Sequence, residues 1–444
     1  MSEDRSRVVR KVIVASFLGN FVEWFDYATY SYLAVIISRV FFPQGTSRDA
    51  LVQTFAIFAL SFLLRPIGAV LWGCWGDKYG RRWSLSVSIL MMAVASFLIG
   101  CLPSFAVAGA FAPIGLLVCR MVQGFSASGE YAGAATFLAE YAPACRRGCY
   151  VSIVPASTAA GLLMGSLSAA MIAGCLPQGA VGTWGWRLPF LAAGPLGLLA
   201  RHVWLELEDS PVYQELSESE TGAAVGLGPL KTLLREHQRS LLVSIGVASL
   251  NAVGFYLVLT YLPTYLSNEL GFSSRASFLS VNISLLFYLL AIFVMGWLSD
   301  HVGRKRMLVV ASVGFVLFSV PLFIVMGTGQ LWKACLAEGV LCLFLTANDG
   351  TMASYLAESF PTELRYTGFA VSQNLANAVF GGTASAVCTW VIGVTGSRLA
   401  PAWYLTAVSL LSLCAMVASH EHTGRDLSEV VYGDSVSVRC GRGL

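Results

Sequence analysis

The stretch GCWGDKYGRRWS, residues 73–84, interrupts a long apolar part of the chain with four charged residues between Asp77 and Arg82. A related stretch, GWLSDHVGRKRM, occupies residues 296–307, and its Asp300 follows Asp77 by 223 residues. At this offset three further positions agree: Gly73 with Gly296, Gly80 with Gly303, and Arg81 with Arg304. The chain therefore carries the same charged segment twice, which indicates an internal duplication.

A second pair of segments supports the duplication. LAEYAP at 138–143 corresponds to LAESFP at 356–361, at an offset of 218 residues. The two pairs occur in the same order and at nearly the same offset. The chain is therefore interpreted as two related halves.

The composition places these halves in a membrane. Only 12% of the 444 residues are charged and 56% are hydrophobic, whereas a soluble domain carries about 25% charged residues. We therefore expect a polytopic membrane protein whose outer surface contacts the lipid bilayer. The net charge of +3 comes from scattered basic residues, and this pattern argues against a nucleic-acid partner.

Twelve apolar stretches are long enough to cross the bilayer, which takes about 20 helical residues. They form two groups of six, near 16–40, 51–74, 83–103, 108–131, 149–175 and 187–206, then 240–266, 277–298, 307–327, 334–355, 367–394 and 401–419. The predicted organisation is a six-helix bundle over 1–206, a cytoplasmic linker over 207–239, a second six-helix bundle over 240–420 and a short tail over 421–444. Two related bundles are expected of a secondary transporter with its substrate site at the midplane.

Lysine and arginine gather in the loops on one side of the predicted bundles. Because cytoplasmic loops carry the excess of basic residues, both termini and the linker are predicted to be cytoplasmic. The basic N-terminus leads into an apolar stretch that reaches Val40 without a small-residue cleavage site. We interpret it as the first spanning helix and not as a signal peptide.

No motif of a membrane-embedded enzyme is present, since the sequence has no GxSxG, HExxH, Walker loop or GxGxxG. Nine of the cysteines lie in or beside apolar runs without a CxxC pair, which predicts packing residues and not disulfides or a metal site. These are Cys74, Cys101, Cys119, Cys149, Cys175, Cys335, Cys342, Cys388 and Cys414. We expect no enzymatic activity, no metal and no cofactor apart from a coupling proton.

Charged residues within the spans are the strongest functional signal, because an ionisable group at bilayer depth costs roughly 2.5–3.5 kcal/mol. Glu23, Asp26 and Glu130 are the candidates for proton coupling, since burial and a nearby cation tune a carboxylate. Arg65 and Arg120 are the expected counter-charges. The alternative is a purely structural set of ion pairs between spans 1, 2 and 4.

Two acidic residues lie in the tenth predicted span, near 334–355. Glu338 is near its predicted outer end, and Asp349 stands in the sequence Asn-Asp-Gly at 348–350. Two interpretations of that sequence remain open, a break in a cavity-lining helix and a polar turn.

The duplicated charged loops are predicted to act as gates. Asp77 and Asp300 can pair with basic residues or lie at the N-terminus of a neighbouring helix, and Gly80 and Gly303 permit tight turns. The alternative is that the basic residues only set the topology. The gating candidates are Gly73, Asp77, Gly80, Arg81, Glu140, Arg147, Asp300, Gly303, Arg304, Glu358 and Arg365.

The pattern G-x-x-x-D-[KR]-x-G-R-[KR] at 73–82 resembles the signature loop of the major facilitator superfamily. RMVQG at 120–124 resembles the R-x-x-Q-G motif of that superfamily, whose arginine is implicated in proton transfer or substrate binding. Further segments resemble its metabolite:proton symporter branch: GNFVEWFDY (19–27), FLLRPIGA (62–69), QGFSASGEY (123–131), WGWRLPF (184–190) and LTYLPTYL (259–266). The resemblance extends from about residue 12 to residue 427.

The resemblance implies an all-α major facilitator fold of twelve transmembrane helices in a bacterial inner membrane. It implies proton-coupled symport of a small molecule by alternating access, with a proline- or betaine-type zwitterion favoured by LTYLPTYL and by EHTGRDL at 421–427. An α-ketoglutarate- or citrate-type organic acid is the alternative, since two arginines at depth suit it. A transporter-derived sensor and a passive facilitator are minor alternatives, and no oligomeric state is predicted.

A zwitterion needs a cation for its carboxylate and an aromatic or acidic site for its ammonium group. The candidates for substrate binding are Arg65, Arg120, Trp24, Tyr27, Tyr131, Asn251, Tyr256 and Asn374. The aromatic residues among them are also ordinary packing or lipid-facing residues, so packing is the alternative for each.

Overall fold

The structure is a computed structural model that describes residues 3–44, 46–209, 214, 228–421, 423–424 and 427. Residues 210–213 and 215–227 of the linker predicted over 207–239, and most of the predicted tail, lie outside the described residues. All regular secondary structure in the described residues is helical. The predicted all-α fold class is therefore confirmed.

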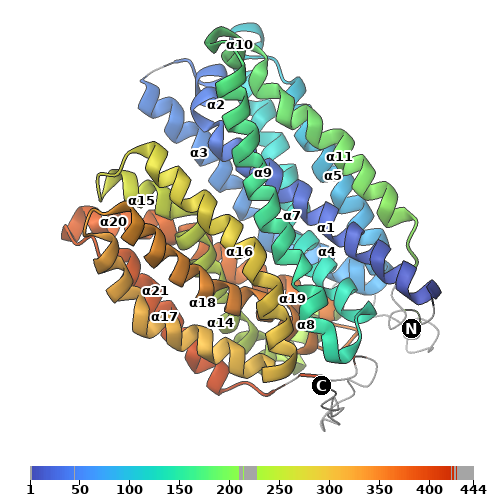
Figure 1. Cartoon of the computed structure of the whole chain (residues 1–444). Coiled ribbons are helices and arrows are strands. Elements are labelled where there is room, and N and C mark those ends of the chain that lie inside the picture. The colour runs from blue at the N-terminus through green and yellow to red at the C-terminus, as the bar shows by residue number, and fades with distance from the viewer. Residues whose placement is uncertain are drawn as a thin grey trace. The chain divides into compact units, whose positions relative to one another are not determined.

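The described residues up to 209 form eleven α-helical segments and two short 3₁₀ segments, which can be followed along the chain in Figure 1. Their bounds are α1 (Glu3–Tyr32), α2 (Ala34–Phe41), α3 (Ser47–Leu63), α4 (Arg65–Tyr79), α5 (Arg81–Cys101), α6 (Phe105–Ala108), α7 (Phe111–Tyr141), η1 (Ala144–Arg146), α8 (Arg147–Val151), α9 (Ile153–Cys175), α10 (Gln178–Thr183), η2 (Gly185–Arg187) and α11 (Leu188–Leu205).

The second half continues with α-helices and two π-helical segments, η3 and η4. Their bounds are α13 (Gly228–Glu236), α14 (Gln238–Phe255), η3 (Tyr256–Tyr261), α15 (Leu262–Asn268), α16 (Ser274–Val302), α17 (Arg304–Met326), α18 (Leu331–Glu358), α19 (Arg365–Ala376), η4 (Asn377–Gly381), α20 (Gly382–Thr395) and α21 (Ala400–Val417).

Eleven helical stretches of the described chain are long and apolar enough to cross a membrane. The long helix α1 is not among them, because Asn20, Glu23 and Asp26 lower its mean hydropathy. With α1 the number is the predicted twelve. Large apolar side chains on these helices are exposed, among them Leu63, Phe111 and Trp390, as expected of a surface that contacts lipid.

Two compact units share the chain. The first comprises Met1–Ala134 and Ser157–Asp209, and the second comprises Ala135–Ala156 and Ser210–Leu444. The segment 135–156, which contains the end of α7, α8 and the start of α9, thus belongs to the second unit, although it lies in the first sequence repeat. The bundle bounds predicted from the sequence stay a prediction.

Small residues allow close helix packing within the first unit. In this unit α11 lies against both α1 and α5 (Figure 1). A Cβ atom on Gly197 would lie 2.3 Å from the Cβ of Ala93, and one on Gly124 would lie 2.0 Å from the carbonyl oxygen of Ser61. These contacts are typical of membrane helices, which associate through small residues.

In the second unit α18 occupies a central position between α16 and α17 (Figure 1). It also contacts α8 and α14. The predicted break or polar turn at Asn348–Gly350 is wrong, because α18 is one continuous helix through these residues. Gly350 instead permits close packing, since a Cβ atom there would lie 3.0 Å from the carbonyl oxygen of Ile292 on α16.

The first two predicted spans each contain a local interruption that the apolar pattern does not indicate. The first span divides into α1 and α2 at Leu33, and the second divides into α3 and α4 at Leu64. Pro66 stands in the first turn of α4, where its missing N–H group is tolerated. The interruption places Arg65 at the start of a helix within the predicted span.

Candidate functional site

The first buried ion pair of the first unit joins α4 to α1. Arg65 Nη2 lies 3.2 Å from Glu23 Oε1, and both side chains are at most 5% exposed. The Arg65 guanidinium also lies 4.6 Å from the ring centroid of Phe62 and 5.0 Å from that of Tyr27. Aromatic faces attract a cation electrostatically, so they help to hold this arginine in place.

The second buried ion pair joins α7 to α1. Arg120 Nη1 donates to Asp26 Oδ2 at 2.9 Å, and neither side chain is exposed. The Arg120 guanidinium lies 3.6 Å from the ring centroid of Tyr30. Glu23 and Asp26, three residues apart on α1, thus each bind an arginine of a different neighbouring helix.

Some donor and acceptor atoms of these ion pairs form no hydrogen bond with the described residues. Among the described residues, Glu23 Oε2 accepts no hydrogen bond, and Arg120 Nε and Nη2 donate none, although all three atoms are buried. Buried polar groups in proteins are nearly always hydrogen-bonded. The pairs are therefore suited to receive a further polar ligand or a proton.

Glu130, the third predicted acidic candidate, is in a different environment. It is 1% exposed, forms no ion pair with any described residue, and its Oε2 accepts no hydrogen bond. It faces α1, because a Cβ atom on Gly19 would lie 3.2 Å from Glu130 Oε1. The two expected counter-charges thus bind Glu23 and Asp26 and leave Glu130 without a cation.

Aromatic side chains surround the two arginines. The Tyr27 ring centroid lies 5.9 Å from that of Trp24, 5.7 Å from Phe58 and 6.0 Å from Phe62. The structure therefore brings the predicted Trp24 and Tyr27 together near Arg65. Tyr131 follows Glu130 on α7 and is half-buried.

Sequence reasoning missed several polar residues that stabilise this arrangement. Asn20 Nδ2 on α1 donates to Ser157 Oγ at 2.9 Å and to Thr158 Oγ1 at 2.7 Å on α9. Gln123 Nε2 donates to Ser96 Oγ at 2.8 Å. Asn20 and Gln123 lie within apolar spans, so their polar side chains alone could have indicated hydrogen bonds between helices.

The remaining substrate candidates belong to the second unit. Asn251 is buried on α14, and its amide nitrogen donates no hydrogen bond within the described residues. Asn374 Nδ2 donates to the carbonyl of Ala370 one turn earlier, at 2.9 Å. Tyr256 begins η3 and packs near Gly381 of η4, where an added Cβ atom would lie 2.7 Å from the Tyr256 ring. π-Helical segments are frequent at functional sites.

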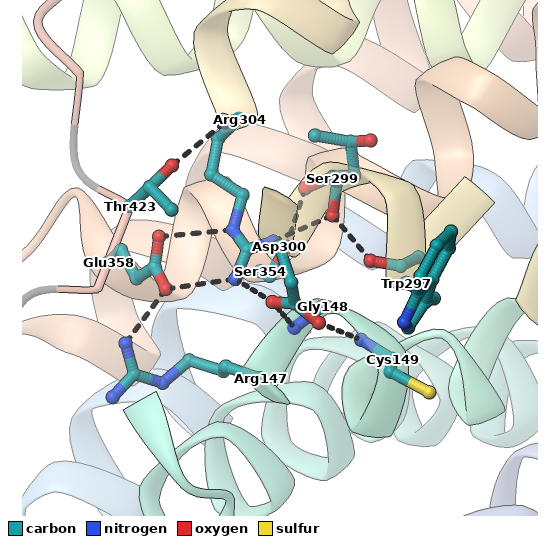
Figure 2. A network of polar contacts seen from close by, with 12 residues as sticks. Arg147, Gly148, Cys149, Trp297, Ser299, Asp300, Arg304, Ser354, Glu358 and Thr423 are labelled. Atoms are coloured by element: carbon teal, nitrogen blue, oxygen red, sulfur yellow. Dashed lines mark hydrogen bonds and ion pairs between the residues drawn. The ribbon is translucent and has the colours of Figure 1, made fainter. Parts of the chain in front are cut away.

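The duplicated charged motif of the second half is the centre of a polar network (Figure 2). Arg304 Nη2 donates to Asp300 Oδ1 at 2.6 Å. Asp300 also accepts hydrogen bonds from the backbone N–H groups of Gly148 at 2.8 Å and Cys149 at 2.9 Å. These N–H groups lie at the start of α8, where the partial positive charge of a helix attracts an anion.

Glu358 lies between two arginines in the same network (Figure 2). Its Oε1 is 2.7 Å from Arg147 Nη1, and its Oε2 is 3.4 Å from Arg304 Nε. A matching pair is formed by Glu140 Oε1 and Arg365 Nη1 at 2.7 Å, and both side chains are fully buried. The segments LAEYAP (138–143) and LAESFP (356–361), called here the LAE segments, therefore exchange partners. Glu140 of the first binds Arg365, which follows the second, and Glu358 of the second binds Arg147, which follows the first.

The two copies of the charged loop have similar local structures. Gly80 and Gly303 adopt φ angles of 97° and 106°, which favour glycine. In the first copy Asp77 lies 3.3 Å from Arg81, one helical turn away. Gly73 is buried in α4 beside this loop.

In each copy, an acidic residue that sequence reasoning missed accepts hydrogen bonds from the start of the following helix. Asp209 accepts from the backbone N–H of Arg81 at 3.1 Å, and Glu421 accepts from that of Arg304 at 3.1 Å. Both acids follow the last helix of their half. A comparison of the two sequence halves could have found them, because they occupy this corresponding position.

Comparisons with known proteins agree with this arrangement. The sequence pattern described as "Major Facilitator Superfamily" matches residues 16–386. A proline/betaine transporter of Salmonella typhimurium is 35% identical over 425 residues, which is 94% of this chain and 85% of the relative. A glycine betaine/proline/ectoine/pipecolic acid transporter of Dickeya dadantii is 36% identical with the same coverage.

Solved structures show the same fold. The proton:xylose symporter XylE bound to 6-bromo-6-deoxy-D-glucose superposes with a TM-score of 0.80 at 20% identity, over 96% of this chain and 98% of that one. A partially occluded, inward-open form of the xylose transporter from E. coli gives a TM-score of 0.68 at 18% identity, over 95% of this chain and 100% of that one.

Proposed function

The chain belongs to the major facilitator superfamily, and on this premise we propose that it is a proton-coupled symporter of a proline- or glycine betaine-type zwitterion. The two relatives at 35% and 36% identity carry such names. The observation that carries the proposal is the pair of buried ion pairs, Arg65–Glu23 and Arg120–Asp26, among aromatic rings. We also place the chain in a bacterial inner membrane, with both termini in the cytoplasm.

The charges of the site support a zwitterion over an organic di- or tricarboxylate. Arg65 and Arg120 are each already neutralised by a carboxylate of α1. A substrate with two or three negative charges would need excess positive charge. A zwitterion adds no net charge, and its cationic group suits the rings of Trp24 and Tyr27.

Proton coupling follows from competition for Arg120. When Asp26 takes a proton, the ion pair loses its attraction, and the guanidinium becomes available to the substrate carboxylate. When the substrate leaves, the restored pair favours release of the proton. Glu23 and Arg65 repeat this arrangement one turn earlier on α1, and Glu130 is a third site that can take a proton.

The network around Arg304, Glu358 and Arg365 is the proposed gate. Its ion pairs are fully or almost fully buried, which strengthens their electrostatic attraction. They hold one conformation of the transport cycle and separate in the other, as alternating access requires. No cofactor is proposed, because the proton gradient supplies the driving force.

The function is tested by uptake into proteoliposomes of radiolabelled proline, glycine betaine, α-ketoglutarate and citrate, with and without an inward proton gradient. Gradient-driven accumulation of proline or glycine betaine alone is expected. Accumulation of an organic acid alone would refute the zwitterion assignment. Absence of any accumulation above equilibrium would refute coupled symport.

Asp26→Asn provides the test of the coupling residue. This variant is expected to lose gradient-driven accumulation while it retains exchange of labelled for unlabelled substrate, because it cannot release a proton. Glu363→Gln, which removes an exposed carboxylate in a loop, is the matched control. Normal accumulation by Asp26→Asn would exclude Asp26 as the coupling group.

A further inference from the structure

A third type of buried carboxyl lies in the second unit, outside the proposed transport site. Glu338 on α18 is fully buried. Its Oε2 accepts a hydrogen bond from Ser280 Oγ of α16, and its Oε1 has no partner among the described residues. The side chain therefore has one satisfied oxygen and one oxygen free to carry a proton.

The groups around Glu338 are neutral. Cys335 Sγ donates to Ser280 Oγ at 3.4 Å, and Cys342 Sγ donates to the carbonyl of Ser284 at 3.9 Å. Cys335, Ser280 and Glu338 thus form a chain of hydrogen bonds between α16 and α18.

No arginine, lysine, histidine or second acid of the described residues forms an ion pair or hydrogen bond with Glu338, whether from α14, η3, α16, α17, α18 or α19. The nearest charges along its two helices are Arg275 and Lys333. Each stands five residues before the serine or glutamate of the pair.

Carboxyl groups of α18 contact neighbouring helices at three levels. Near one end Glu338 binds Ser280 of α16, in the middle Asp349 accepts from Tyr288 Oη of α16, and at the other end Glu358 binds Arg304 at the start of α17. The 20 residues between Glu338 and Glu358 correspond to about 30 Å of helix. Of the glutamates at the two ends, the one in the gate has cationic partners, and Glu338 has only a hydroxyl donor.

We propose that Glu338 is a proton-binding site of the second unit, distinct from the carboxylates of α1 and α7, and that the bound proton holds these ends of α16 and α18 together. An isolated carboxylate without a cation is costly to bury, whereas a neutral carboxyl group hydrogen-bonded to Ser280 is compatible with the site. Loss of the proton creates a charge that requires water. The ends of the two helices then separate to admit it.

The first test uses infrared spectroscopy of the full chain in proteoliposomes, with no substrate added. The difference spectrum of the parent protein minus Glu338→Gln is expected to contain the carbonyl band of one protonated carboxyl group, because protonated carboxyl groups of the first unit contribute equally to both spectra and cancel. Glu363→Gln, which alters an exposed acid, is expected to retain the band. Identical spectra for the parent and Glu338→Gln would overturn the proposal. Loss of the band on addition of sodium ions at constant pH would also overturn it, because the site would then bind a metal cation in place of the proton.

Ser280→Ala keeps the proposal testable if Glu338→Gln does not fold. This variant retains the carboxyl group and removes its hydrogen-bond donor. Its carbonyl band is expected to shift in frequency without being lost, because the hydrogen bond is gone. An unchanged band would overturn the assignment to Glu338.

The second test uses the half-buried Cys335 as a reporter of helix separation. In a chain whose other cysteines are replaced, maleimide labelling of Cys335 is compared between the parent and Glu338→Gln as the pH rises. Ionisation of the thiol raises both rates, so the ratio of the rates isolates the effect of Glu338. A ratio of parent to variant that rises with pH is expected, and a constant ratio would contradict the coupling of the proton to the helix contact. Neither test depends on the transported substrate.

Discussion

At the scale of the residue, substitutions in the Arg120–Asp26 pair should have large effects on both stability and gradient-driven uptake. Arg120→Ala leaves the Asp26 carboxylate buried without its cation, which is expected to lower the free energy of unfolding by about 3–5 kcal/mol. The double variant Asp26→Asn with Arg120→Gln removes both charges and should recover much of that loss, while gradient-driven uptake stays absent. Unfolding in a denaturing-detergent titration measures the first effect, and proteoliposome uptake measures the second.

The control for this experiment is Arg39→Ala, which removes an exposed arginine of α2. Its free energy of unfolding is expected to change by no more than about 0.5 kcal/mol. If the double variant were as unstable as Arg120→Ala alone, an uncompensated charge would not be the cause of the destabilisation.

The sequence was sufficient to select the acids and arginines of the first unit, because a charge within an apolar span is conspicuous. It was not sufficient to assign the partners. Glu23, Asp26 and Glu130 look equivalent in the sequence, and the packing of α1, α4 and α7 gives Glu23 and Asp26 each an arginine, whereas Glu130 forms an ion pair with none of the described residues. The contacts of Asn20 with α9 depend on the same packing.

At the scale of the element, the close approach of α7 to α3 predicts an asymmetric response to two glycine substitutions. Gly124→Ala places a Cβ atom 2.0 Å from the backbone oxygen of Ser61, which cannot move without its helix. This variant should lose about 1–3 kcal/mol of unfolding free energy through overpacking. Gly393→Ala in α20 meets no atom within 4 Å and should be neutral or up to about 1 kcal/mol stabilising.

Thermal unfolding of the purified protein in detergent distinguishes the two glycine variants. Equal melting temperatures for Gly124→Ala and Gly393→Ala would show that α3 and α7 separate easily.

The helices themselves were largely predictable, since twenty apolar residues have few alternatives in a bilayer. Their irregularities were not. The break at Leu64, which places Arg65 at the start of α4, is not indicated by the apolar pattern. The π-helical segments η3 and η4 contact each other through Tyr256 and Gly381, which are far apart in the sequence. The error at Asn348–Gly350 arises because a turn-forming sequence remains helical when neighbouring helices pack around it.

At the scale of the whole molecule, the exchanged pairs predict rescue by charge reversal. Glu140→Arg alone places two cations side by side in a buried position and should abolish uptake and lower stability. The double variant Glu140→Arg with Arg365→Glu restores opposite charges and should recover part of both properties.

A combination of Glu140→Arg with Arg147→Glu is the matched control, because Arg147 binds Glu358 and not Glu140. Uptake and thermal unfolding of the single, double and control variants measure the effect. Equal recovery in the control would mean that net charge, and not the specific pair, is what matters.

The duplication of the sequence anticipated the similarity of the two charged loops but not the exchange of partners between the LAE segments. Offsets between repeats compare each segment with its copy, and they contain no information on which copy a side chain contacts. The exchange arises because segment 135–156 packs with the elements of the second half.

This exchange has a consequence for the descent of the chain. Once Glu140 binds Arg365 and Glu358 binds Arg147, a mutation that alters one copy is selected against unless the other copy changes with it. The two copies can therefore diverge freely elsewhere but must inherit these four positions together. Recombination that joins the front of one homologue to the back of another should yield working proteins only when both parents carry the same set of four charges.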